Sequence, residues 1–259
     1  MKVSEYASVL VTSMPLSLSF KYSIIFIMNW RLYMIICKNR ELKTKTKLVI
    51  FDMDGLIFDT EKLFMETQAP ILEKYGYKQR KENYVKTLGI AGENLKRTLY
   101  DIYGSDYPDE IISNETRKQM NYIIKKNGLQ IKPGIKELLQ ALFAANIPCV
   151  VASSTKTEIV LKYLKRAGID KYFSFVIGGD KVNESKPNPE IFLKALKSVD
   201  VPLEAALILE DSENGLLASK NANIPSICIP DLKYPEPEYE SIPAYIVETG
   251  FDVIDILRI

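Results

Sequence analysis

The chain has 259 residues, of which 47% are hydrophobic and 26% charged, as in a globular protein long enough for a large domain with a smaller insert. The net charge of +1 gives no support for a nucleic-acid partner, and the absence of histidine excludes His-based catalytic pairs and His-ligated metal sites. Three cysteines without metal-type spacing fit a reducing compartment, so we expect a cytoplasmic location.

Residues 1–46 differ from the rest of the chain. The apolar run at 20–40 is interrupted by Asn29 and Arg31, whereas a membrane-spanning helix needs about 20 nearly uninterrupted apolar residues. The run also lacks the pattern of a signal peptide. We therefore expect an N-terminal extension rather than a membrane segment.

From Lys47 onward, short apolar runs rich in β-branched residues alternate with helical patterns. Strands are predicted at 47–51, 147–154, 173–180, 205–211 and 224–230, with a short sixth at 244–248. Such runs are typical of parallel strands that are covered on both faces. Helices are predicted at 134–146, 157–169 and 188–199, where Gly168 should end the second and Asn188 with Pro189 should begin the third. This order predicts an α/β fold with a doubly wound, Rossmann-like parallel sheet.

One long segment contains no convincing strand. Between Phe64 and Gly128 the patterns predict helices at 63–77, 94–104 and 109–128. We therefore expect a small α-helical cap, residues 64–128, inserted after the first strand. The α/β core would then comprise residues 47–63 and 129–259.

Polar side chains follow several of the predicted strands. They are Asp52 and Asp54 after the first strand, Ser153 and Ser154 at the second, Lys186 beyond the third, and Glu210 and Asp211 at the fourth. Ligands bind beyond the carboxyl ends of the strands in open α/β sheets, so these groups should converge. Clustered carboxylates repel each other, and a hard cation such as Mg²⁺ would relieve the repulsion. Lysine and hydroxyl groups suit a phosphoryl oxygen.

Two simpler readings of the first aspartate pair fail. A calcium-binding EF-hand loop needs glycine at its sixth position and an acid at its twelfth, but Gly55 stands fourth and Leu63 twelfth. A solvated turn explains one Asp-Gly pair, but not polar groups at three further strand ends. The P-loop sequence GxxxxGK[ST] does not occur.

Four segments, DMDGLIFDT, VVASST, SKPNPEIF and ILEDSENGL, resemble in order and spacing the four motifs of the haloacid dehalogenase superfamily. The similarity runs from Lys47 to the C-terminus, and the helical insert matches the small cap of the beta-phosphoglucomutase-like phosphatases. The resemblance implies hydrolysis of a phosphate ester through a phosphoaspartyl intermediate. An aspartate nucleophile is already ionised at neutral pH, which suits a chain without histidine.

The resemblance also implies a role for each motif residue. Asp52 would be the nucleophile, Asp54 the general acid and then base, Ser153 a ligand of the phosphoryl group, and Lys186 its neutralising charge. Mg²⁺ would be held by Asp52, the Asp54 backbone carbonyl and Asp211, with Glu210 as a ligand or a nearby partner. Substrate contacts would come from Ser153, Ser154 and Lys186, and from Gly92 and Glu93 in the cap.

Two alternatives to a phosphatase remain open. A sugar phosphomutase of this type usually has a histidine shortly after the first motif and an arginine in the cap, where this chain has Phe64 and Gly92. The second alternative is a binding protein without turnover, which would be free to lose Asp52 or Lys186. We predict a monomeric, Mg²⁺-dependent phosphatase acting on a small phosphorylated metabolite, without a nucleic-acid or membrane partner.

Further predictions concern residues near the motifs. Gly89 and Arg97 lie with Gly92 and Glu93 in a possible specificity loop. Three tyrosines fit either the substrate cleft or the core of the cap: Tyr84, Tyr100 and Tyr103. Asp59 and Thr60 should shape the turn into the cap. Ser212 and Asn214 should cap the next helix rather than surround the metal.

Overall fold

The computed structural model describes residues 42, 45–88, 90 and 92–259. Most of the expected extension, residues 1–46, and Gly89 of the possible specificity loop lie outside these residues. In the described part of the chain, no helix has both the length and the apolar character needed to cross a bilayer.

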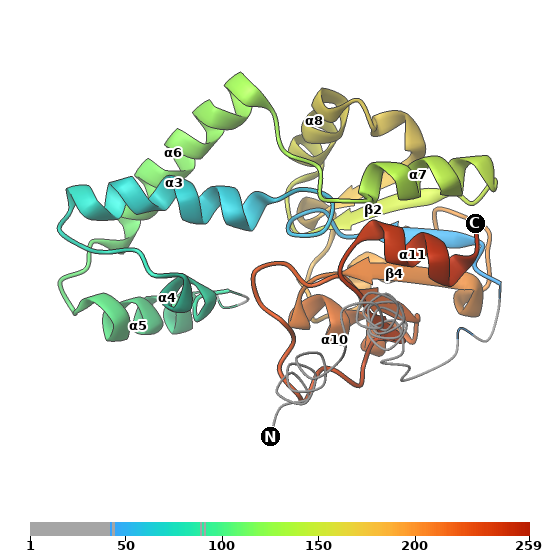
Figure 1. Ribbon diagram of the computed structural model, residues 1–259. Helices are drawn as coiled ribbons and strands as arrows, with labels where there is room; N and C mark the ends of the chain where they lie inside the picture. The colour runs from blue at the N-terminus through green and yellow to red at the C-terminus, as the bar shows by residue number, and fades with distance from the viewer. Residues whose placement is uncertain (1–41, 43–44, 89, 91) are drawn as a thin grey trace, which may run out of the picture. The chain divides into compact units, whose positions relative to one another are not determined.

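In the described part of the chain, six parallel strands form one sheet (Figure 1), in the order β3-β2-β1-β4-β5-β6. Their bounds are β1 Leu48–Phe51, β2 Cys149–Ser153, β3 Phe173–Gly178, β4 Ala206–Glu210, β5 Ser226–Cys228 and β6 Tyr245–Ile246. The sheet order reverses around β1, whose neighbours are β2 and β4. The predicted doubly wound α/β sheet is therefore confirmed, and the strand that carries the aspartate pair is central.

The two faces of the sheet have separate apolar cores. Alternate β1 residues enter them, Val49 and Phe51 on one face and Leu48 and Ile50 on the other, as the two-residue period of a strand requires. On the first face lie α7 (Ile135–Ala144), α8 (Thr157–Ala167) and α11 (Gly250–Leu257). On the second lie α9 (Glu190–Leu196) and α10 (Glu213–Ala222). Burial on both faces explains the continuous apolar strands.

The predicted ends of two helices can be compared with the structure. Gly168 ends α8 with a left-handed φ of 67°, as predicted. Helix α9 has Pro189 rather than Asn188 at its N-cap, but the Asn188 side chain still accepts a hydrogen bond from the Glu190 backbone N–H at 2.9 Å. Short 3₁₀ turns occupy Asp170–Tyr172, Gly179–Lys181 and Leu203–Ala205.

Among the described residues between β1 and α7 there are four helices: α3 (Thr60–Lys74), α4 (Lys81–Val85), α5 (Gly92–Tyr103) and α6 (Asp109–Asn127) (Figure 1). Helix α4 was not predicted, because five residues are too few for a periodic pattern. Helices α3 and α6 pack together, and Leu72, Tyr107 and Ile112 are buried in a cluster that Tyr100 and Tyr103 also contact. The cap boundaries 64–128 stay a prediction. Helix α3 begins at Thr60, before the predicted start of the cap.

Candidate active site

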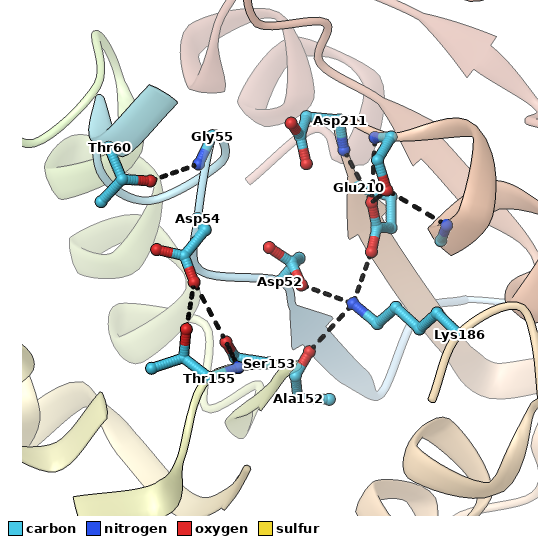
Figure 2. Close-up of polar contacts among 12 residues, drawn as sticks. Asp52, Asp54, Gly55, Thr60, Ala152, Ser153, Thr155, Lys186, Glu210 and Asp211 are labelled. Atoms are coloured by element: carbon cyan, nitrogen blue, oxygen red, sulfur yellow. Dashed lines mark hydrogen bonds and ion pairs between the residues drawn. The ribbon is translucent and has the colours of Figure 1, made fainter. Parts of the chain in front are cut away.

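Lys186 joins two buried carboxylates at the carboxyl ends of neighbouring strands (Figure 2). Its Nζ donates to Asp52 Oδ1 after β1, to Glu210 Oε1 at the end of β4 at 2.6 Å, and to the Ala152 carbonyl of β2 at 3.2 Å. Burial lowers the pKa of Lys186, but the charges of Asp52 and Glu210 outweigh this effect and raise it above its usual value. The lysine is therefore a fixed positive charge beside Asp52.

The protein environment disfavours the charged form of Asp52, the carboxylate beside Lys186. Burial raises its pKa to about 7 against the opposing charge of Lys186, and the charges of Glu210 and Asp54 add to the rise. A buried carboxyl group whose ionised form would be stabilised by a bound cation is typical of a functional site.

Glu210 has hydrogen-bond donors on both carboxylate oxygens. Oε1 is held by Lys186, and Oε2 accepts from the backbone N–H groups of Asp211 and Ser212 and from the Ser212 hydroxyl, each at 3.0 Å. The same hydroxyl accepts from the Gly215 N–H and caps α10, as predicted for Ser212. A Cβ on Gly215 would lie 1.8 Å from Glu210 Cδ, so only glycine leaves room for this carboxylate.

Asp54 points to the opposite side, toward one hydroxyl group at the end of β2 and one just after it (Figure 2). Its Oδ2 accepts from Thr155 Oγ1 at 2.7 Å and from Ser153 Oγ at 3.4 Å, and the Thr155 backbone N–H in turn donates to Ser153 Oγ at 3.0 Å. The sequence reasoning named Ser154, which is exposed, and missed Thr155. The missed signal was a third hydroxyl residue in the run that follows the strand.

The turn after Asp54 brings its backbone against Asp211. Gly55 has a φ of +78°, and a Cβ at this position would lie 2.2 Å from Asp211 Oδ2. The Gly55 N–H donates to the Phe58 carbonyl at 3.0 Å and to Thr60 Oγ1 at 3.2 Å. Thr60 therefore shapes this turn, as expected, and glycine is required by both the φ and the contact.

The carboxylates of Asp52 and Asp211 fit a hard divalent cation. Burial, followed by the charges of Glu210 and Asp52, raises the pKa of the Asp211 carboxyl well above its usual value. Three or more acidic or cysteine side chains do not converge on one point in this part of the chain. A cation here would therefore need main-chain carbonyl and water ligands as well, which is the usual coordination of Mg²⁺. Because both carboxylate oxygens of Glu210 already accept hydrogen bonds, Glu210 is better suited to holding the neighbouring groups in place than to coordinating the cation.

Two cavities adjoin these carboxylates. One, of about 350 Å³, is lined by Asp54 and by residues of α3 to α6, among them Glu61, Phe64 and Tyr84. Tyr84 donates to Glu61 Oε2 at 2.6 Å, and its ring stacks on that of Phe64 at a centroid distance of 6.1 Å. The other, of about 430 Å³, is lined by Asp211, Asp231 and Glu61. Tyr84 and Tyr103 line the first cavity, and Tyr100 lines neither.

Gly92 and Glu93 stay predicted substrate contacts, although the structure places them outside the lining of these two cavities. Both residues are exposed at the start of α5, and neither they nor Arg97 line the two cavities. From the same loop, Leu88 and Ile90 line both cavities. Apolar residues of a short irregular loop carry no sequence pattern that distinguishes them from a buried core.

A family model for haloacid dehalogenase-like hydrolases matches residues 49–229, which is more than half of the chain. The chain belongs to the haloacid dehalogenase-like hydrolases. This match includes every motif residue named above, from Asp52 to Asp211. The family that the motifs resembled is therefore confirmed.

Similar proteins include two that are named as phosphatases and one that is named as a mutase. A phosphorylated carbohydrates phosphatase of Thermotoga maritima is 31% identical over 69% of this chain and 82% of the relative. A probable pseudouridine-5'-phosphatase of Drosophila melanogaster is 31% identical over 74% of this chain and 85% of the relative. The crystal structure of a putative beta-phosphoglucomutase from Thermotoga maritima matches with a TM-score of 0.67 and 26% identity, over 82% of this chain and 99% of that one.

Proposed function

We propose that the protein hydrolyses a small phosphate monoester with Mg²⁺, through a phosphoaspartyl intermediate on Asp52. The enzyme class, a phosphoric monoester hydrolase of the haloacid dehalogenase family, is confirmed by the family match and the named relatives. The observation that carries the proposal is that the two aspartates of one turn contact different kinds of groups. Asp52 faces the ammonium group of Lys186, whereas Asp54 faces the hydroxyl groups of Thr155 and Ser153.

This pairing suits the two halves of the reaction. An oxygen of Asp52 attacks phosphorus, the ester P–O bond breaks, and Asp54 gives its proton to the leaving alcohol oxygen. Asp54 then takes a proton from water, whose oxygen attacks the phosphorus of the aspartyl phosphate. The bond from phosphorus to Asp52 breaks, which releases inorganic phosphate and restores both carboxyl groups. Lys186 offsets the negative charge that the two anions bring together.

Asp52, Asp211 and the Asp54 backbone carbonyl would hold the cation, with Glu210 fixing Lys186 and the turn that follows β4. When bound, Mg²⁺ supplies the positive charge that lets a carboxylate approach a dianionic phosphate. Phosphatases of this family are generally Mg²⁺-dependent, which supports the same assignment for this chain.

Removing divalent cations is expected to silence the enzyme. Without a cation, Asp52 and Asp211 keep raised pKa values, and the single charge of Lys186 is not enough to offset the repulsion between these carboxylates and a phosphate dianion. Phosphate release should fall to background after dialysis against EDTA and return when Mg²⁺ is added. Undiminished activity after chelation, with the metal content checked by elemental analysis, would contradict the metal role.

Thr155 is expected to position Asp54. Thr155→Val removes the 2.7 Å hydrogen bond to Asp54 Oδ2 but keeps the size of the side chain, so we expect kcat to fall about tenfold with little change in KM. Thr155→Ser, which keeps the hydroxyl, should retain most of the activity. Equal kcat values for the valine and serine variants would show that the hydroxyl does not act on Asp54.

The cavity beside Asp54 supports hydrolysis over isomerisation. Phe64 stands where related mutases carry a histidine, and its ring is stacked on Tyr84. A mutase must bind a second phosphate, but the carboxylates of Glu61 and Asp109 also line this cavity, with Arg117 as the one cation among the lining residues that the structure describes. Polar groups such as Gln79, Asn83 and Thr87 suit the hydroxyl groups of an uncharged leaving alcohol.

The test is an assay with glucose 1-phosphate and a catalytic amount of glucose 1,6-bisphosphate. We expect release of inorganic phosphate without accumulation of glucose 6-phosphate. Isomerisation would establish the mutase alternative instead. If a panel of sugar phosphates, nucleotides and pyridoxal phosphate bound without any turnover, the binding-protein alternative would replace both.

A further inference from the structure

A buried ion pair outside the motifs holds the turn that follows Asp54. Lys132 precedes α7, and its Nζ donates to the Gly55 carbonyl at 2.7 Å and to Asp231 Oδ1 at 2.7 Å. The side chains of Lys132 and Asp231 are only 9% and 10% exposed. Burying two charges is costly, so a pair that also bonds the backbone of the active-site turn calls for a functional reason.

The hydrogen bond from Lys132 holds the second of the two backbone polar groups of Gly55. The Gly55 N–H is held by Phe58 and Thr60, and its carbonyl is held by Lys132. Because a peptide group is planar, the direction of the Gly55 N–H also sets the direction of the Asp54 carbonyl. Both peptide groups that flank Gly55 are therefore fixed, and one of them carries the proposed main-chain cation ligand.

Asp231 and Asp211 approach this glycine from the same side. A Cβ on Gly55 would lie 2.2 Å from Asp211 Oδ2 and 3.4 Å from Asp231 Oδ2. Asp231 Oδ2 is buried and has no hydrogen-bond partner in the described part of the chain. The ion pair of Lys132 and Asp231 therefore lies against the same glycine as the proposed metal ligand Asp211.

We propose that Lys132 is a positioning residue, held by Asp231, that fixes the Asp54–Gly55 turn against Asp211 for binding of the divalent cation. This inference rests on the proposed function for its metal, but not on the identity of the substrate. Residues that orient metal ligands from outside the coordination sphere commonly affect metal affinity strongly.

The test compares the Mg²⁺ dissociation constants of full-length variants, measured by calorimetry without substrate. Lys132→Met removes the anchor and leaves Asp231 unpaired, whereas the double variant Lys132→Met/Asp231→Asn removes the anchor without changing the net charge of the pair. We expect both variants to bind Mg²⁺ about tenfold more weakly than the wild type. Their kcat should fall, whereas their KM should change little. Lys132→Arg, which keeps the charge and the donors, should recover part of the loss.

The control breaks an ion pair far from the turn. Lys74 and Glu115 form an exposed pair at 2.9 Å, and Lys74→Met/Glu115→Gln should leave Mg²⁺ binding unchanged. If Lys132→Met does not fold, the double variant carries the test alone. Wild-type Mg²⁺ affinity in the double variant, or its failure to fold, would overturn the proposal. Absence of phosphatase activity in the wild type would instead refute the proposed function and leave the binding comparison valid.

Discussion

Replacing Asp52 with asparagine is expected to abolish phosphatase turnover and leave the fold intact. The amide cannot attack phosphorus, and Glu210, the other carboxylate beside Lys186, already accepts hydrogen bonds from four donors and is not free to replace it as the nucleophile. We expect kcat to fall by at least about 10⁴-fold, as for the loss of other catalytic nucleophiles. The measurement is phosphate release under Mg²⁺ saturation, with circular dichroism to verify the fold.

The pH dependence of the unfolding free energy of Asp52→Asn provides a second test, whose direction follows from the raised pKa of Asp52. Burial raises the pKa of Asp52 from 3.8 to about 7, so the folded protein binds this proton more tightly than the unfolded chain does. The stability gained from the proton is fully present below about pH 4 and is lost as the pH rises to about 7. Since asparagine does not titrate, Asp52→Asn should gain stability relative to the wild type across this range. Urea unfolding in EDTA at several pH values measures the difference.

Retained turnover in Asp52→Asn, checked by mass spectrometry for deamidation back to aspartate, would refute the nucleophile assignment. Loss of turnover together with loss of folded structure would show instead that Asp52 is needed for the fold. A matched control is Asp101→Asn in α5, an exposed carboxylate that lines neither cavity and should change neither property.

The variant Lys186→Met is expected to lose both activity and stability. Lys186 is the cation that Asp52 and Glu210 share, and all three side chains are less than a tenth exposed. Without it, two buried carboxylates face each other unpaired, and breaking a buried ion pair in this way costs about 3–5 kcal/mol. Turnover should also fall by about 10³-fold, because the metal ion alone does not neutralise both Asp52 and the phosphate dianion that approaches it.

The control for Lys186→Met is Lys194→Met in α9. Lys194 pairs with Glu190 one helical turn away at 2.7 Å, but its side chain is 43% exposed. Such a pair contributes about 0.3–0.5 kcal/mol, so this variant should unfold at nearly the wild-type urea concentration. Equal unfolding free energies for the two methionine variants would show that Lys186 does not hold the buried carboxylates.

The sequence by itself determined the sheet and the set of reacting groups. Continuous apolar runs such as Leu48–Phe51 can be buried only on both faces of a parallel sheet, and the carboxyl ends of such strands meet at one edge. Position along the chain was therefore enough to bring Asp52, Lys186 and Glu210 together. Their chemistry required no knowledge of the distances between them.

Only the tertiary structure decided which neighbours complete the site. Thr155 rather than Ser154 reaches Asp54, because the chain turns sharply after β2 and the direction of each side chain depends on that turn. Lys132 and Asp231 are 99 residues apart and meet only through folding. The position of Leu88 and Ile90 beside both cavities was likewise decided only by folding, because a loop has no periodicity from which the direction of its side chains can be inferred, whereas a strand does.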